Sequence, residues 1–174
     1  VVFAAEAYTQ CPLTLDTRII LEILDSVRTG VIEDGTAIGN ALATGVNRLR
    51  DSEAKSKVII LLTDGENNAG QISPTEAAEM ARAMGVKVFP VMVGKGGLVP
   101  YPDGTDLFGR TVYRQVEIPV NPELLRQIAQ TTGGEFYVAT DRASLEGGLR
   151  DILDRLEKTR LFEAGSYVRY TEVF

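Results

Sequence analysis

The sequence predicts an α/β domain built on a doubly wound, mainly parallel sheet flanked by helices. Three observations lead to this prediction. A run rich in isoleucine and leucine, residues 58–63, is typical of a strand buried on both faces. Segments with helical spacing of apolar residues alternate with short strand-like runs along the chain. The chain has 174 residues, the size of one ordinary domain, and no shift in composition divides residues 1–174.

The N-terminal part is expected to contain a strand at residues 1–4 and then two helices. Asp16 can cap the first helix, and Gly30 fits its C-terminal end. The second helix is expected over residues 36–50, before the strand at 58–63. The side chains expected to face the core are Ile19, Ile20, Ile23, Leu24 and Val27 in the first helix, and Ile38, Leu42, Val46 and Leu49 in the second.

The middle of the chain carries a strong helix-start signal followed by an irregular stretch. Ser73 and Glu76 form a capping box around Pro74, which predicts a helix that ends at Gly85. The strand expected at residues 86–93 contains Pro90, which favours a sheet edge, a bulge or an early bend. Glycines and prolines then predict a long loop over residues 94–119, with a short hairpin inside it at 110–118.

The C-terminal part is expected to add two more helices and two short strands. A helix begins at Asn121 and Pro122 and ends at Gly133, and a strand follows at residues 136–138. Asp141 or Ser144 caps a long final helix, and the alternating tail at 166–174 is expected to form a strand. The side chains of the final helix expected to face the core are Leu145, Leu149, Ile152, Leu153 and Leu156.

Composition excludes several classes of function. The net charge is -6 and no basic block occurs, which argues against nucleic-acid binding. No run approaches the roughly 20 apolar residues that span a bilayer, and no secretory signal is visible, so these residues are expected to be soluble. Because the chain has no histidine, it can form neither a His-dependent triad nor a His-ligated zinc site. The single Cys11 forms no internal disulfide and is expected to pack as a small hydrophobe.

Two segments carry oxygen-bearing side chains suited to a metal. Asp64 directly follows the strand at 58–63, and the carboxyl ends of parallel strands are where α/β sheets bind ligands. Thr36, in the sequence Gly-Thr-Ala-Ile-Gly, offers a hydroxyl at the start of a helix. Hard oxygen ligands of this kind suit Mg²⁺ or Mn²⁺. An isolated Thr-Asp-Gly turn is more often a simple cap, so the two segments have to be weighed together.

Taken in order, four segments of the chain resemble the von Willebrand factor type A (vWA) domain, and within it the BatA-type proteins of bacterial aerotolerance operons. They are residues 1–4, 8–16, 33–39 and 62–70. The resemblance implies a metal-ion-dependent adhesion site (MIDAS). In that site Thr36 would bind the metal directly, and Asp64 would bind it directly or through water.

The chain departs from the family because it contains no Asp-x-Ser-x-Ser motif. The family layout places that motif after a first central strand, so this strand and the first helix are expected upstream of Val1, and residues 1–174 are expected to be a truncated single domain. Most of the metal shell would then lie outside, which predicts weak or absent Mg²⁺ or Mn²⁺ binding. Without the first strand, a slot with two unpaired edges would lie between the strand at residues 1–4 and the strand at residues 58–63. We expect this slot to be closed by direct pairing of these two strands, by recruitment of the tail at 166–174, or by strand exchange in an oligomer.

The function that the resemblance implies is a non-enzymatic, protein-binding module. The full-length protein would be anchored in the inner membrane, with this domain in the periplasm. It would bind other membrane proteins of its operon. Its role would be in aerotolerance, in the stress response or in the assembly of an envelope complex. Residues 66–71 and the loop after Gly94 would set selectivity. One alternative is a Mg²⁺-dependent hydrolase or phosphotransferase with Asp64 as nucleophile and Asp34 and Glu66 as further carboxylates, although no phosphate-binding Gly-Lys-Ser/Thr loop is present. Another is a scaffold with a vestigial site.

Overall fold

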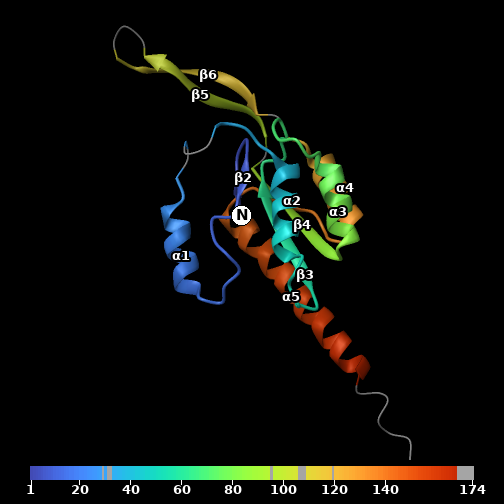
Figure 1. Cartoon of the computed structure of the whole chain (residues 1–174). Coiled ribbons are helices and arrows are strands. Elements are labelled where there is room, and N and C mark those ends of the chain that lie inside the picture. The colour runs from blue at the N-terminus through green and yellow to red at the C-terminus, as the bar shows by residue number, and fades with distance from the viewer. Residues whose placement is uncertain (29, 31–32, 95, 106–108, 119, 168–174) are drawn as a thin grey trace, which may run out of the picture.

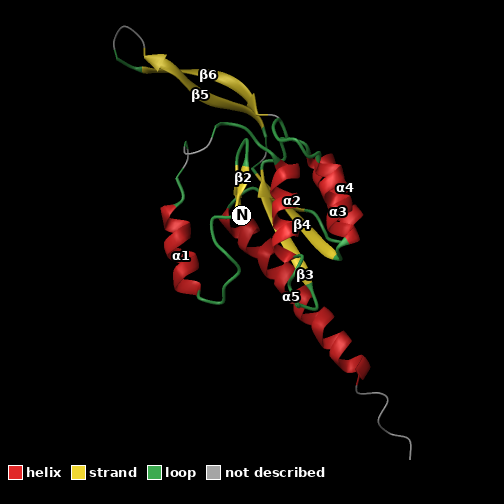
Figure 2. Cartoon of the chain, in the orientation of Figure 1, coloured by secondary structure: helices red, strands yellow, loops and turns green. Residues whose placement is uncertain are grey.

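The computed structural model describes all residues except 29, 31–32, 95, 106–108, 119 and 168–174. Its central sheet has three parallel strands in the order β3 (Lys57–Thr63), β4 (Val86–Val93) and β7 (Tyr137–Ala139). Two antiparallel pairs stand apart from it, β1 (Val2–Phe3) with β2 (Ala7–Tyr8), and β5 (Gly97–Thr105) with β6 (Thr111–Ile118). The helices are α1 (Thr17–Ser26), α2 (Ile38–Leu49), α3 (Pro74–Ala83), α4 (Pro122–Thr132) and α5 (Arg142–Tyr167) (Figure 2).

Helices cover both faces of the three-stranded sheet (Figure 1). On one face α2, α3 and α4 pack against β3 and β4, and the side chains of Ile38, Leu42 and Leu125 are fully buried there. On the other face Ile152 of α5 packs against Phe89 and Val91 of β4. This layered arrangement confirms the predicted α/β class with a parallel sheet between helices.

Local signals placed most helix ends correctly. The predicted capping box is present, since the Ser73 hydroxyl accepts a hydrogen bond from the Glu76 N–H and the Glu76 carboxylate accepts one from the Ser73 N–H. Helix α4 ends at Gly133, whose φ of 71° is the left-handed conformation that glycine adopts readily. Asp141 starts α5, because its carboxylate accepts a hydrogen bond from the Ser144 N–H at 2.8 Å.

Pro90 lies in the central strand β4, so the predicted sheet edge is wrong. The structure explains why proline is tolerated there. The Val88 N–H donates to the Thr132 hydroxyl instead of to β3, and alternate residues of a strand direct their N–H groups to the same side. The nitrogen of Pro90 therefore faces the flank where β7, which pairs only with Val91–Val93, offers no partner. Proline removes no ladder hydrogen bond at that position.

Helix α1 does not bury the face predicted to be inward. It ends at Ser26 before Gly30, and none of its residues is buried; the side chains of Ile19 and Leu24 are 45% and 63% exposed. Figure 1 shows α1 standing away from the sheet. The physical reason is that no other element of the described chain packs extensively against it.

The slot beside β3 is not closed by the predicted rearrangement. Strand β1 pairs with β2 and β3 pairs with β4, so the expected pairing of residues 1–4 with 58–63 is wrong. The face of β3 that carries Ile60 and Leu62 is also partly open, with exposed fractions of 37% and 46%, and the strand is not buried on both faces. The strand-exchanged oligomer stays a prediction.

The hairpin predicted within residues 94–119 is present but longer than expected. Residues 97–105 form strand β5 instead of a loop and pair with β6, and the β5–β6 hairpin extends away from the body of the domain (Figure 1). The predicted C-terminal strand is wrong. The tail residues Ser166 and Tyr167 belong to α5 and not to a strand, while 168–174 lie outside the described residues. Leu153 faces solvent with 56% of its surface exposed, because α5 turns the neighbouring Ile152 toward the sheet.

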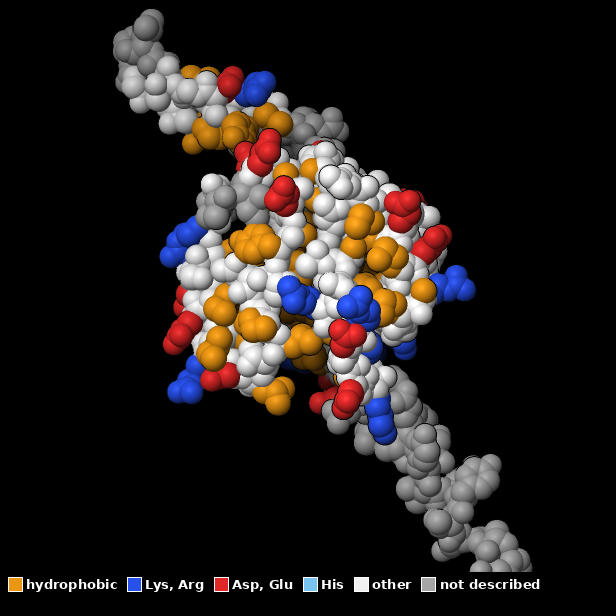
Figure 3. Space-filling view, viewed as in Figure 1, with side chains coloured by type: hydrophobic (Ala, Val, Ile, Leu, Met, Phe, Trp, Pro, Cys, Tyr) orange, Lys and Arg blue, Asp and Glu red, His pale blue; other side chains and the backbone are white. Residues whose placement is uncertain are grey.

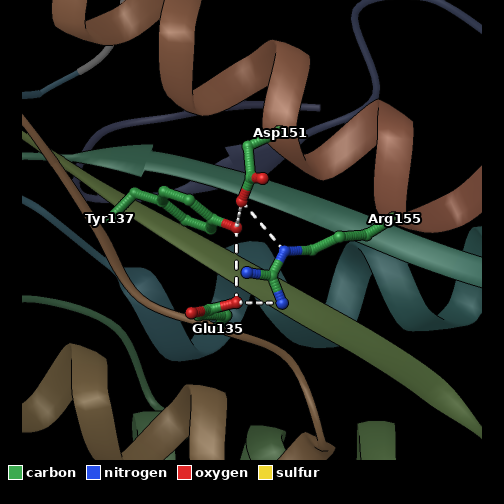
Figure 4. Close-up of polar contacts among 4 residues, drawn as sticks. All are labelled: Glu135, Tyr137, Asp151 and Arg155. Carbon is green, nitrogen blue, oxygen red and sulfur yellow. Dashed lines mark hydrogen bonds and ion pairs between the residues drawn. The ribbon is translucent and has the colours of Figure 1, made fainter.

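A cluster of four polar side chains connects α5 to β7 and the residues just before it (Figure 4). Its members are Glu135, Tyr137, Asp151 and Arg155. The Tyr137 hydroxyl donates to Asp151 Oδ2 at 2.6 Å, and Arg155 Nε donates to the same oxygen at 2.9 Å. Arg155 also forms an ion pair with Glu135 at 2.7 Å. Burial and the hydrogen bond to Asp151 raise the pKa of the Tyr137 phenol. The Tyr137 hydroxyl and the Arg155 guanidinium in turn hold the pKa of Asp151 below its usual value.

Replacing Tyr137 with phenylalanine is expected to loosen this attachment and to lower the Tm at pH 7 by roughly 2–4 °C. A carboxyl group whose pKa is lowered by folding stabilises the fold above its ordinary pKa of 3.8, and that stabilisation is lost as the pH falls through the folded value. The difference in Tm between the two proteins should therefore shrink at pH 3, as thermal melts at both pH values would show. The exposed Tyr101, changed to phenylalanine, is the control; a Tyr137→Phe effect of equal size at pH 3 and pH 7 would contradict the role of Asp151.

Candidate functional site

Asp64 lies at the carboxyl end of β3, immediately after Thr63. Two hydrogen bonds from the backbone shape the turn, since the Gly65 N–H donates to the Thr63 hydroxyl at 3.2 Å and the Glu66 N–H donates to Asp64 Oδ1 at 3.3 Å. Gly65 has φ of 90°, and a Cβ there would lie 3.2 Å from the backbone nitrogen of Asn121. The turn thus requires glycine and leaves the exposed Asp64 carboxylate at the edge of the sheet.

Thr36 lies in the loop before α2, and its backbone is fixed to the segment that follows Asp64. The Thr36 carbonyl accepts hydrogen bonds from the N–H groups of Asn68 and Ala69 at 3.1 and 3.2 Å. The Thr36 N–H donates to Asn68 Oδ1 at 2.8 Å. The structure therefore joins the two predicted metal-binding loops, and it leaves the Thr36 hydroxyl without a hydrogen bond to any residue it describes.

Asparagine side chains hold the start of α2 in place. The N-cap position, Ala37, has no capping side chain, and Asn67 Oδ1 accepts the hydrogen bond from the Ile38 N–H at 2.9 Å instead. Asn40 Oδ1 accepts hydrogen bonds from the Gln71 and Ile72 N–H groups at 3.1 and 3.0 Å. Sequence reasoning missed these supporting roles. The one available signal was the pair of asparagines directly after the acidic turn.

The residues after strand β1 are also hydrogen-bonded to the loop before α2. The Ala37 N–H donates to the Ala4 carbonyl at 2.8 Å, and the Ala5 N–H donates to the Glu33 carbonyl at 3.3 Å. Three chain segments distant in sequence, around residues 4–5, 33–37 and 66–69, therefore meet at one edge of the domain. Such a frame can hold short polar side chains in fixed positions.

The loops joined at this edge carry the two oxygen-bearing side chains that the sequence predicts as metal ligands. The Thr36 hydroxyl and the Asp64 carboxylate are hard oxygen ligands, the kind that Mg²⁺ and Mn²⁺ accept. Within the described part of the chain, no group of three acidic or cysteine side chains is placed to hold a metal ion. Two protein ligands would leave a six-coordinate Mg²⁺ bound mainly by water. The residues present therefore do not by themselves fit a closed Mg²⁺ shell.

The family model of the von Willebrand factor type A domain matches residues 1–154. The chain belongs to the vWA family. This confirms the family inferred from the four sequence segments, and it assigns the parallel sheet with flanking helices to the vWA fold.

Solved structures of bacterial proteins show the same fold. BatB from Bacteroides thetaiotaomicron, described as a conserved hypothetical protein, has a TM-score of 0.70 and 27% identity, over 90% of this chain and 77% of its own. An aerotolerance-related membrane protein from Bacteroides fragilis has a TM-score of 0.67 and 25% identity, over 90% of this chain and 76% of its own. This vWA domain is therefore related to proteins of the Bat type.

A metal-bound protein and two curated relatives are also similar to this chain. Proximal thread matrix protein 1 from the mussel byssus, described with a zinc-occupied MIDAS motif, has a TM-score of 0.56 and 26% identity over 79% of this chain and 29% of its own. An uncharacterized protein of Borreliella burgdorferi is 27% identical over 153 residues, 87% of this chain and 44% of that protein. A UPF0353 protein of Nocardia farcinica is 27% identical over 174 residues, 91% of this chain and 49% of that protein. The chain thus spans about half the length of these curated relatives.

The described helices of this vWA domain include none with the length and apolar character needed to cross a bilayer.

Proposed function

We propose that this vWA domain is a non-enzymatic, protein-binding module of a BatA-type membrane protein, and that residues 1–174 carry part of its MIDAS. The observation that supports this most directly is the union of the two loops that bear Thr36 and Asp64. Hydrogen bonds between Thr36 and Asn68 hold these loops together at the carboxyl end of β3. That is the edge where sheets of this type bind ligands.

The remaining metal ligands would come from a segment upstream of residue 1. Thr36 would then bind Mg²⁺ or Mn²⁺ directly, and Asp64 would bind it directly or through a water molecule. A cation held in this way offers an open coordination position to an oxygen ligand of a partner protein. The 174 residues alone would bind the metal weakly or not at all.

The proposal also includes a cellular role, which the relatives support. In this proposal the full-length protein is anchored in the inner membrane with this domain in the periplasm, and the description of one structural neighbour as an aerotolerance-related membrane protein supports the membrane anchor. Its partners would be other membrane proteins of the same operon, in aerotolerance, stress or envelope complex assembly. Residues 66–71 and the segment after Gly94 flank the Asp64 edge and would set the choice of partner.

The alternative, a Mg²⁺-dependent hydrolase or phosphotransferase with Asp64 as nucleophile, would need further carboxylates grouped with Asp64. No observation in the structure favours it. The two proposals differ in a simple measurement, since phosphatase activity that is lost on Asp64→Ala would support the enzyme.

Calorimetric titration with Mg²⁺ and Mn²⁺ tests the proposed site. A chain extended upstream through an Asp-x-Ser-x-Ser motif is expected to bind, and Thr36→Ala or Asp64→Ala should weaken that binding at least about tenfold. Asp34→Asn, an exposed change in the same loop, is the matched control and should leave binding unchanged. Equally tight binding by residues 1–174 alone would contradict the partial site, and binding that survives Asp64→Ala would contradict the assigned ligand.

A further inference from the structure

The β5–β6 hairpin projects from the domain as a two-stranded ribbon (Figure 1). No helix or strand of the described chain packs extensively against it. Residues 111–115 of β6 are exposed, and Figure 3 shows hydrophobic side chains at the surface of the hairpin. The side chains of Tyr101, Val112 and Tyr113 are among the large exposed hydrophobic groups. Because an isolated two-stranded hairpin is only marginally stable in water, a further strand would stabilise this ribbon.

Two prolines fix the hydrogen-bonding pattern of the hairpin. Pro100 pairs with Gln115, and Pro102 pairs with Tyr113. Along an antiparallel ladder, pairs that exchange backbone hydrogen bonds alternate with pairs whose backbone groups point away from each other. Since proline has no N–H, Pro100 and Pro102 occupy pairs of the second kind. The backbone N–H and C=O groups of Tyr113 and Gln115 therefore point outward, along the free edge of β6.

The two outer edges of the hairpin differ in their capacity to bind a further strand. The outer edge of β5 lacks two donors, because Pro100 and Pro102 lie on it, and proline is a common means of blocking edge pairing. Strand β6 contains no proline and pairs only with β5 among the described residues. Its β-branched and aromatic side chains favour an extended conformation. The hairpin is therefore open to strand addition on one edge only.

The sequence of β6 is compatible with antiparallel pairing to a second copy of itself. Because facing residues of a sheet point to the same side, a twofold axis between two identical strands places one residue opposite its own copy. The longest registers pair residues 111–117 about Arg114 or residues 112–118 about Gln115. The first opposes two guanidinium groups, whereas the second opposes two neutral amides and places Arg114 opposite Val116. Since the backbone of Gln115 points outward, the central pair of the second register would exchange two backbone hydrogen bonds.

We propose that the free edge of β6 binds β6 of a second copy of this chain, in the antiparallel register centred on Gln115. The two hairpins then form one four-stranded antiparallel sheet. Its outer strands are the two β5 strands, whose prolines prevent further addition, so the assembly closes as a dimer and does not grow into a fibre. The antiparallel arrangement places the two domain bodies at opposite ends of the shared sheet. This contact is separate from the proposed metal site, because it requires neither Thr36 nor Asp64.

Sedimentation velocity of residues 1–174 measures the association. Because the contact is small, we expect a weak dimer whose fraction rises between about 10 µM and about 1 mM protein. Gln115→Pro removes the outward N–H and leaves the β5–β6 ladder intact, as Pro100 does on the facing strand. It should weaken dimerisation at least about tenfold without changing the Tm of the domain. Leu98→Pro is the matched control, because it removes an outward N–H from the edge of β5 and should leave dimerisation unchanged.

A charge exchange at position 115 tests the register. Gln115→Lys or Gln115→Glu alone opposes two like charges at the twofold axis, and each should weaken its own dimer about threefold or more. A mixture of the two variants opposes lysine to glutamate and should restore dimerisation, which sedimentation with one fluorescently labelled variant would show. The same two changes at Gln130, an exposed residue of α4, are the matched control and should leave dimerisation unchanged, alone or mixed.

The proposal is overturned if the protein stays monomeric up to about 1 mM, or if Gln115→Pro and Leu98→Pro dimerise equally well. Association beyond a dimer would show that the β5 edges also pair, and it overturns the closed assembly. A mixture of Gln115→Lys and Gln115→Glu that associates no better than either variant alone overturns the register. If Gln115→Pro does not fold, the charge exchange at position 115 still decides.

Discussion

Replacing Gly39 with alanine is expected to destabilise the domain by about 3 kcal/mol or more. Gly39 is buried in the first turn of α2, and a Cβ there would lie 1.9 Å from the carbonyl oxygen and 2.7 Å from the carbonyl carbon of Ile72. Both are backbone atoms of the segment that leads into α3, so no side-chain rotation can relieve the overlap. The segment would have to move, and the hydrogen bonds from Gln71 and Ile72 to Asn40 would be strained with it.

Urea denaturation followed by circular dichroism measures this effect. The matched control is Gly147→Ala, which adds the same methyl group to an exposed position of α5 with no atom within 4 Å. Since alanine favours a helix over glycine, the control should be more stable by about 0.5–1 kcal/mol. A Gly39→Ala protein as stable as the unmodified chain would show that α2 and the segment before α3 do not pack as closely as the structure places them.

The contrast between α3 and α1 shows how far the sequence alone could predict this fold. The signals of α3 are local, because Ser73, Pro74 and Glu76 interact with one another within a single turn. The apolar spacing of α1 correctly predicted a helix, yet whether its stripe is buried depends on elements elsewhere in the chain. Pro90 is a similar case, since its tolerance depends on where β7 begins to pair and not on β4 itself.

The candidate site likewise contains residues that could be identified from local sequence and residues that could not. Asp64 and Thr36 could be singled out because each lies beside glycines at the end of a predicted element. The asparagines that support the site could not be assigned, because Asn67 and Asn40 bind backbone groups about thirty residues distant in sequence. The adjacent pair Asn67 and Asn68 marks the segment after the acidic turn, but only the three-dimensional arrangement of the loops shows which backbone groups the asparagine side chains bind.

Replacing Thr132 with valine is expected to destabilise the domain by about 1–3 kcal/mol, although the two side chains have nearly the same shape. The Thr132 hydroxyl is buried at the end of α4, where it accepts a hydrogen bond from the Val88 N–H at 3.1 Å and donates one to the Ile128 carbonyl at 2.9 Å. Valine would leave the Val88 N–H buried without an acceptor on the flank of β4 that β7 does not reach.

Thr132→Ser separates the loss of the hydroxyl from the loss of packing. Serine retains the acceptor for Val88 and removes one methyl group, so it should cost only about 0.8 kcal/mol. Hydrogen exchange adds a local readout, because the Val88 amide should exchange faster in the valine variant than in the serine variant at matched global stability. If serine destabilised the domain more than valine, the Thr132 hydroxyl could not be the group that satisfies β4 at this position, and packing of its methyl group would be its main contribution.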